Sequence, residues 1–126
     1  MAIPTETKQP WESWFIWGSI LNVQEDGDEK VTLAGSQILA MDKDGKDAQG
    51  VIVDLSTMVL GDDPTGNYQE NMLGVRLQGG TIDKSPYMVT FKMFTTSSNK
   101  YEAEMKITVK ELPTTPLPVS TTTTTI

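Results

Sequence analysis

The strongest constraint on the fold is a pair of alternating segments in the C-terminal half of the chain. Apolar and polar side chains alternate over residues 87–93, and they alternate more strictly over residues 101–109. Because side chains along a strand point to opposite faces in turn, each segment is expected to be a strand with one apolar face. The polar stretch TTSSN at 95–99 predicts that the two strands form a hairpin. The fold-defining inner positions are Tyr87, Val89, Phe91, Tyr101, Met105, Ile107 and Val109, and Met93 and Ala103 lie on the same inner face.

Shorter alternating segments precede this hairpin. Strands are expected at 31–33 and 36–41, at 50–58 with Val51, Val53 and Leu55 on one face, and at 68–77 with Leu73, Val75 and Leu77 inward. The Asp-Gly-containing turn at 42–47 predicts a hairpin between the second and third of these. With no convincing helix, the pattern predicts an all-β fold, an antiparallel β-sandwich of about seven strands.

Tyr87 has two interpretations. It begins its strand directly after a turn, where an immunoglobulin-like sandwich places a tyrosine whose hydroxyl bonds to nearby backbone. The alternative is an ordinary core aromatic side chain.

The 126 residues are expected to form one domain with extended arms at both ends. Residues 1–22 are interpreted as an N-terminal arm with an aromatic segment, and residues 23–112 as the sandwich. Residues 113–126 are a charge-free tail rich in proline and threonine, which is expected to be extended on its own.

All three tryptophans, Trp11, Trp14 and Trp17, lie in one short segment together with Phe15. Contiguous aromatic surface is rarely left exposed on soluble monomers, so this segment is expected to be covered. It either packs on its own domain as a strand or lid, or docks on a neighbouring subunit, since aromatic side chains dominate interface hot spots. We predict an interface formed by Trp11, Trp14, Phe15 and Trp17 together with Pro113, Pro116, Leu117 and Pro118 of the tail.

Composition excludes several classes of function. The net charge is −7, with no run of basic residues, so nucleic-acid binding is not expected. The chain has no cysteine and no histidine, which removes disulfides, thiolate nucleophiles and triads built on histidine. We therefore predict a protein that is not an enzyme and that uses no cofactor. No apolar run approaches the roughly 20 residues that cross a bilayer, and no secretory signal is recognised, so no membrane partner is expected.

The acidic loop at 42–47 invites comparison with a calcium site. Asp42, Asp44 and Asp47 lie close together in sequence, and hard cations need several oxygen ligands. The loop lacks the order of ligands and the glutamate that complete a calcium-binding loop of the EF-hand type. A solvated turn is the preferred interpretation, with a metal site as the weaker alternative.

Several segments resemble small immunoglobulin-like virion proteins of tailed phages. The similarity lies in VRLQGGT at 75–81, YMVT at 87–90, TTSS at 95–98 and the closing strand at 102–110. A looser similarity covers Pro10, the aromatic run to Trp17, the turn at 27–28 and a strand start at Ser36. The chain departs from that pattern at Ile16, where the family has an aspartate, and in its extra tail. These motifs belong to the scaffold, cover most of residues 8–112 and identify no active site.

The resemblance implies a structural, non-catalytic subunit of a virion, of the fibre–tail adaptor or neck type. Its partners would be other virion structural proteins and copies of itself in a ring or array, assembled in the host cytoplasm. A capsid decoration protein of the same fold is one alternative, and a carbohydrate-binding or adhesion module with exposed tryptophans is another. An enzyme built on paired carboxylates such as Glu102 and Glu104 is the least favoured, because those side chains are most simply solvated.

Overall fold

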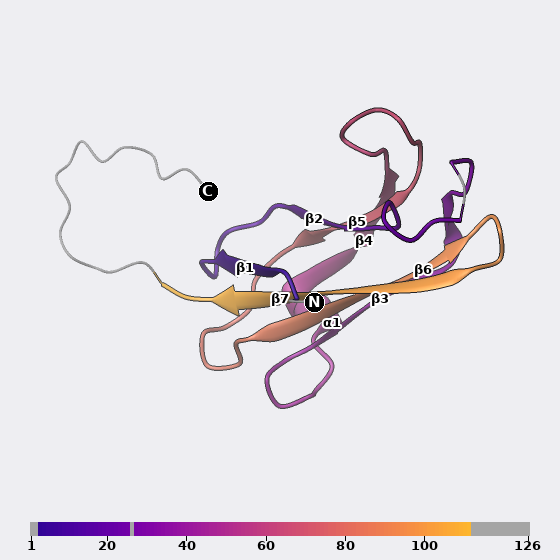
Figure 1. Cartoon of the computed structure of the whole chain (residues 1–126). Helices are drawn as coiled ribbons and strands as arrows, with labels where there is room; N and C mark the ends of the chain where they lie inside the picture. Colours follow the sequence, from indigo (N-terminus) through magenta and orange to yellow (C-terminus); the bar gives the residue numbers. More distant parts are fainter. Residues whose placement is uncertain (1–2, 26, 112–126) are drawn as a thin grey trace, which may run out of the picture.

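The computed structural model describes residues 3–25 and 27–111, and it shows two β-sheets packed face to face as a sandwich (Figure 1). One sheet has four strands in the order β1-β7-β6-β3, and the other has three in the order β2-β5-β4. The elements are β1 (Thr5–Lys8), β2 (Phe15–Ser19), β3 (Val31–Met41), α1 (Gln49–Ile52), β4 (Val53–Gly61), β5 (Met72–Leu77), β6 (Tyr87–Thr95) and β7 (Lys100–Val109).

The predicted C-terminal hairpin is confirmed. Strands β6 and β7 pair antiparallel from Tyr87 opposite Ile107 to Phe94 opposite Lys100. The inner residues of β6 are buried, as are Ile107 and Val109 at the end of β7. Period-2 alternation therefore identified both the strands and the faces that they bury.

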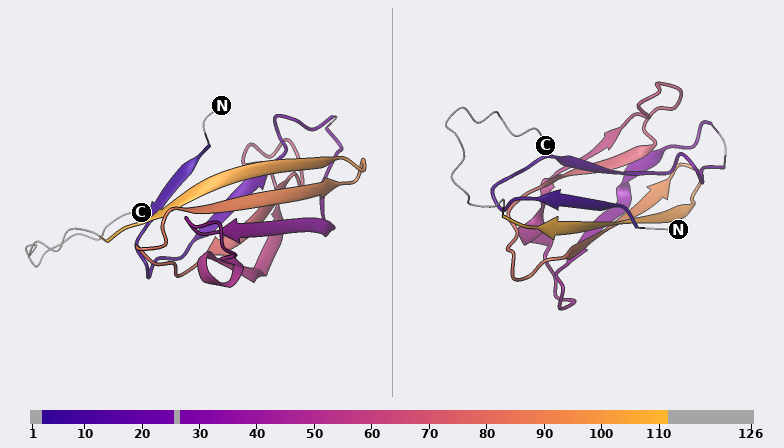
Figure 2. Two further views of the ribbon diagram at one scale, coloured as in Figure 1. Left: turned by 90° about the horizontal axis from the view of Figure 1, so that it is seen from below. Right: turned by 60° about the vertical axis from the view of Figure 1, so that its left-hand side comes forward.

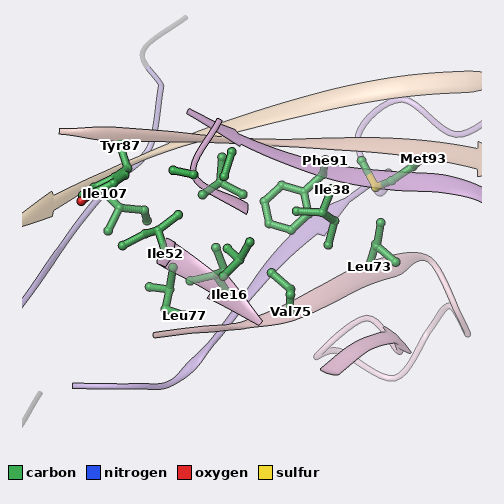
Figure 3. Close-up of a cluster of buried hydrophobic side chains, with 14 of the residues drawn as sticks. Ile16, Ile38, Ile52, Leu73, Val75, Leu77, Tyr87, Phe91, Met93 and Ile107 are labelled. Carbon is green, nitrogen blue, oxygen red and sulfur yellow. The ribbon is translucent and has the colours of Figure 1, made fainter. Parts of the chain in front are cut away.

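The core lies between the sheets and is filled from both sides (Figure 3). Ile16, Val75 and Leu77 enter it from the three-stranded sheet, and Phe91 and Ile107 enter it from the other. Burying each of these side chains contributes about 1.5–3 kcal/mol before the cost of ordering the chain is subtracted. The sheets approach each other closely where Gly18 faces Phe91, since a Cβ atom on that glycine would lie 2.7 Å from the phenylalanine ring.

The described part of the N-terminal segment contributes two strands to the sandwich, so the interpretation of the aromatic segment as a strand on its own domain is confirmed for β2, and the sandwich begins before residue 23. Strand β2 pairs antiparallel with β5, and its Ile16 is buried in the core. Strand β1 pairs with β7 in parallel, so the sandwich is not wholly antiparallel (Figure 2). The polar sequence of β1 concealed a strand that packs through its backbone and one buried lysine, Lys8.

The hairpin predicted around residues 42–47 is wrong. Strand β3 lies in the four-stranded sheet and β4 in the three-stranded sheet, so the connection crosses between layers. The Asp47 carboxylate accepts a hydrogen bond from the Gln49 amide, and the carbonyl of Ala48 accepts from the amides of Val51 and Ile52. This helical turn, α1, redirects the chain. Strand β4 therefore begins at Val53, and the face predicted to hold Val51, Val53 and Leu55 does not form, because only Val53 is buried.

The two short strands predicted at 31–33 and 36–41 are one strand with an irregularity. The pairing of β3 with β6 shifts register between Thr32 and Gln37. Gly35 lies at the centre of this bulge with φ +85°, a conformation that favours glycine. Within the described ranges, no helix is long and apolar enough to cross a membrane.

Candidate interaction surface

The outer face of the three-stranded sheet carries the aromatic side chains of β2. Strand alternation turns Ile16 and Gly18 inward, and Phe15 and Trp17 therefore point outward. Trp17 lies opposite Gly74 of β5, which lies opposite Val59 of β4. These residues share one face of the sheet, and this outer face is our candidate interaction surface.

The indole of Trp17 lies against the backbone of the neighbouring strands. A Cβ atom on Gly74 would be 2.5 Å from the Cε3 and Cζ3 atoms of Trp17, and one on Gly61 would meet the same ring. The ring therefore occupies space that is available only because both of these residues are glycines without side chains. With one side of the ring against the sheet, Trp17 still keeps 36% of its surface exposed, so its other side faces solvent.

Phe15 and Arg76 extend this surface along the sheet. The rings of Phe15 and Trp17 have centroids 5.8 Å apart and planes inclined by 25°. The guanidinium carbon of Arg76, which lies opposite Phe15, sits 4.8 Å from the centre of the phenylalanine ring. This is a cation–π contact, and Arg76 also donates a hydrogen bond to the Ser13 hydroxyl at 3.4 Å. Val59, 39% exposed, adds an aliphatic side chain on β4.

The other aromatic residues of the predicted interface are placed differently. Trp11, in the turn before β2, is 77% exposed. Trp14 packs against the core, and its carbonyl accepts a hydrogen bond from the Leu77 amide at 2.8 Å. The structure therefore groups Phe15 with Trp17 and turns Trp14 toward the core. Pro113, Pro116, Leu117 and Pro118 lie outside the described residues.

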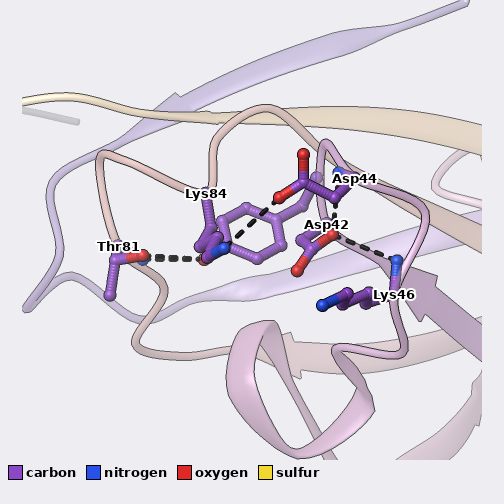
Figure 4. Close-up of polar contacts among 6 residues, drawn as sticks. Asp42, Asp44, Lys46, Thr81 and Lys84 are labelled. Carbon is purple, nitrogen blue, oxygen red and sulfur yellow. Dashed lines mark hydrogen bonds and ion pairs between the residues drawn. The ribbon is translucent and has the colours of Figure 1, made fainter.

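The three aspartates of the loop at 42–47 have different partners, and Figure 4 shows the contacts of Asp42 and Asp44. Asp42 accepts hydrogen bonds from the amides of Asp44 and Lys46, which lower the pKa of its carboxyl, the bond from Lys46 contributing most. Asp44 pairs with Lys84 at 3.3 Å, and this contact raises the pKa of the lysine. Asp47 accepts from the Gln49 amide and holds the start of α1. No group of three or more metal-ligating side chains forms within residues 3–25 and 27–111.

A buried carboxylate that the sequence did not single out joins two distant loops. Glu29, only 1% exposed, accepts hydrogen bonds from the hydroxyl groups of Thr95 and Tyr101 and from the Asn99 amide group. The carboxylate also accepts a hydrogen bond from the backbone amide of Glu25 at 2.7 Å. Burial alone would raise the pKa of Glu29, but these hydrogen bonds together outweigh it and lower the pKa. Glu29 therefore fixes itself and the backbone of Glu25 to the tip of the β6–β7 hairpin.

A buried lysine fixes the N-terminal strand in a similar way. Lys8 is 1% exposed, and its Nζ donates to the carbonyls of Gln9 at 2.7 Å, Pro10 at 3.2 Å and Gly79 at 2.5 Å. Burial lowers the pKa of Lys8, and the charge of Glu12 partly offsets this effect. The lysine thus ties the end of β1 to the loop between β5 and β6.

The hydroxyl of Tyr87 lies at the same end of the sandwich. It accepts a hydrogen bond from the Thr81 amide at 2.9 Å, six residues earlier in the chain, and its ring is buried. The ring of Tyr87 is therefore part of the core, and the hydroxyl makes the bond to nearby backbone that the first of the two interpretations predicts.

Comparison of the chain with models of known protein families and with curated protein sequences finds no match.

Proposed function

We propose that the chain is a structural, non-catalytic subunit of a tailed-phage virion that acts by binding other proteins. Its place would be the neck, the tail or the attachment of a fibre, with capsid decoration as an alternative site for the same fold. The observation that carries the proposal is the outer face of the three-stranded sheet, where Trp17, Phe15 and Val59 present apolar surface to solvent. Exposed aromatic surface of this kind marks protein-interaction sites.

The finer fold assignment that supports this proposal is an immunoglobulin-like sandwich. Lettering the seven strands A to G in chain order, the sheets contain B-E-D and G-F-C, the orders of an immunoglobulin constant domain. Strand β1 is the departure, since it pairs with β7 rather than with β2. The hydrogen bond between Tyr87 and the Thr81 amide matches the tyrosine corner of such domains. This assignment agrees with the phage virion proteins that the sequence resembles.

The net charge of −7 fits a subunit that stays soluble until it meets its partners. Assembly would take place in the host cytoplasm, with other virion proteins and copies of the chain as partners. The most exposed aromatic residue, Trp11, lies at the turn before β2 and adds a second point of contact.

Binding to virion proteins tests the proposal. Immobilised wild-type chain should retain one or more structural proteins from a lysate of disrupted phage particles, identified by mass spectrometry. The variant Trp17→Ser should lose them, because it removes the centre of the outer face without touching the core. Leu33→Ser is the matched control, since Leu33 is 44% exposed on the opposite sheet. Failure of the folded wild-type chain to retain any virion protein would contradict the proposed function.

A glycan is the second candidate ligand for the same face, favoured by the open side of the Trp17 ring. Sugar rings bind flat aromatic surfaces, and here Arg76 stands beside the ring system as a hydrogen-bond donor. Tryptophan fluorescence during titration with a glycan panel would change if this candidate is right. Unchanged fluorescence across the panel would leave protein binding as the function of this face.

A further inference from the structure

Among the described residues, one half of the β7 edge has no neighbouring strand. Strand β1 pairs with β7 only from Lys106 to Val109, and no described strand lies beside residues 100–105 on that side. The backbone amide of Lys106 points away from β6 and donates to the Pro4 carbonyl. Because backbone groups alternate in direction along a strand, those of Glu104 and Glu102 also point away from β6, beyond the edge of the sheet. Pro4 has no N–H to donate to the Glu104 carbonyl, which explains why the regular pairing stops there.

Apolar side chains beside this edge are incompletely covered. Where β1 lies alongside, the inner residues Ile107 and Val109 are 0% and 2% exposed. Where the edge is open, Tyr101, Ala103 and Met105 are only partly buried. An added strand would complete the hydrogen bonds of β7 and cover these side chains together, as in β-strand addition.

The chain itself contains a segment suited to this edge. Residues 119–126 read VSTTTTTI, so seven of the eight residues are β-branched and none is proline. Such residues favour the strand conformation. All charged side chains of the protein lie before residue 112, so this segment can approach an acidic domain without charge repulsion. Eight residues are also enough to cover the six residues of the open edge.

We propose that residues 119–126 of one copy add as a strand to residues 100–105 of β7 in a second copy. This inference rests on the proposed function, in which copies of the chain assemble with one another, and it names the segment and the edge that join them.

The geometry favours a second copy over the chain's own edge. The tail leaves β7 at Glu111, and eight steps at about 3.1 Å per residue carry it about 25 Å to Val119. Running back from Glu111 to Met105 takes about 20 Å at 3.3 Å per residue, before the chain reverses direction. Strand β1 also lies beside this part of β7 and must be bypassed (Figure 2). About 5 Å then remains for both the reversal and the detour, which disfavours the chain's own edge.

Exchange of this kind is heterologous, because the tail and the edge are different surfaces. Each copy then donates its tail to one neighbour and accepts the tail of another neighbour at its own β7 edge. Repetition closes a ring or extends an array, depending on the rotation between neighbours.

Native mass spectrometry and sedimentation of full-length variants test the exchange. Wild-type chain should form oligomers as its concentration rises, and Thr122→Pro should weaken this association at least tenfold, because proline removes a backbone donor from the added strand. Thr115→Pro, between the existing prolines of the tail, is the matched control and should associate as wild type does. An oligomer unaffected by Thr122→Pro, or a wild-type chain that stays monomeric at all concentrations, would overturn the inference.

Disulfide trapping identifies whose edge the tail occupies, and the absence of native cysteines makes it specific. A chain carrying only Glu104→Cys, mixed with a chain carrying only Thr122→Cys, should give a mixed disulfide dimer. A chain carrying both substitutions that forms its disulfide only within itself would show that the tail binds its own edge, and would overturn the proposal. If exchange fails but the chain still retains virion proteins through Trp17, the proposed function stands without this inference.

Discussion

The indole of Trp17 lies directly against Gly74, its partner on β5, and occupies the space where a side chain at that position would begin. A glycine within a strand lacks a side chain to cover its backbone, and here an aromatic ring from the next strand supplies that cover. The same ring also forms the centre of the candidate interaction surface. Its position therefore links the local packing of the sheet to the proposed binding function.

Gly74→Ala should displace this ring. The new Cβ atom would lie 2.5 Å from Trp17, and because the ring is partly exposed it can lift away at a cost of about 1 kcal/mol in free energy of unfolding. Tryptophan fluorescence should shift to the red, and binding through the outer face should weaken. Gly50→Ala is the matched control, since no atom lies within 4 Å of that Cβ position. An unshifted spectrum in Gly74→Ala would show that the ring does not lie on the glycine.

Gly18→Ala should cost more, because the obstruction is in the core. Its Cβ would lie 2.7 Å from the Cγ and 2.9 Å from the Cβ of buried Phe91, which has nowhere to move. We expect a loss of about 2–3 kcal/mol in free energy of unfolding, measured by urea denaturation. Equal stability of Gly18→Ala and the Gly50→Ala control would contradict the close approach of the two sheets at this point.

Glu29→Gln should destabilise the protein and alter its response to acid. All contacts to this carboxylate come from donors, so the amide group of glutamine leaves one donor unpaired, at a cost of about 2 kcal/mol. Because the pKa of folded Glu29 is lowered, its stabilisation is fully present above the unfolded pKa near 4.3 and is lost as pH falls through the folded pKa.

The measurement for Glu29 is the free energy of unfolding between pH 7 and pH 2.5. The wild-type curve should fall more steeply below about pH 4.3 than that of Glu29→Gln. Glu102→Gln serves as the control, because that side chain is 60% exposed, and its curve should follow the wild type. Parallel curves for wild type and Glu29→Gln would contradict the lowered pKa.

Lys8→Met should weaken the attachment of β1 to β7 while keeping a side chain of similar volume at position 8. The substitution leaves the partly buried carbonyls of Gln9, Pro10 and Gly79 without this donor. Hydrogen exchange at the amides of Lys106 and Lys110, which bond to β1 and its flank, should accelerate about tenfold. Lys43→Met, at an exposed position, should leave these rates unchanged. Unchanged exchange in Lys8→Met would show that the lysine does not hold the strand.

Tyr87→Phe should lose about 1 kcal/mol in free energy of unfolding, because the Thr81 amide loses its acceptor while the ring stays in the core. Thermal denaturation measures this loss, and Tyr68→Phe provides a control in the loop before β5. A Tyr87→Phe variant as stable as wild type would show that the hydroxyl does not stabilise the fold, which would contradict its proposed role as a tyrosine corner.

The sequence predicts the β6–β7 hairpin well because its apolar and polar residues alternate, and this alternation indicates directly which face of each strand is buried. Strand β2 was less visible, since tryptophans spaced three residues apart obscured the alternation of Ile16, Gly18 and Ile20. Strand β1 gave no apolar signal, because its main anchor is a buried lysine bonded to carbonyls far along the chain. Local patterns do not reveal contacts of that kind.

The candidate surface was predictable only in part. The aromatic segment was visible in the sequence, but its division into an outward pair, Phe15 and Trp17, and an inward Trp14 depends on the pairing with β5. Glu29 lies in the acidic segment EDGDE at 25–29, whose composition gives no sign of burial. Its donors Thr95, Asn99 and Tyr101 come from 66 to 72 residues further along the chain. Only the tertiary fold brings them together.

The central claim, that this sandwich is a binding-only component of a tailed-phage particle, is tested most directly by finding it there. Quantitative mass spectrometry of purified particles, combined with electron microscopy of particles bearing a label on the chain, measures its copy number and its position. The account predicts several copies per particle at one defined location in the neck, tail or fibre attachment, or on the capsid surface. Particles of the phage that encodes the chain, purified to homogeneity and free of it, would contradict the account.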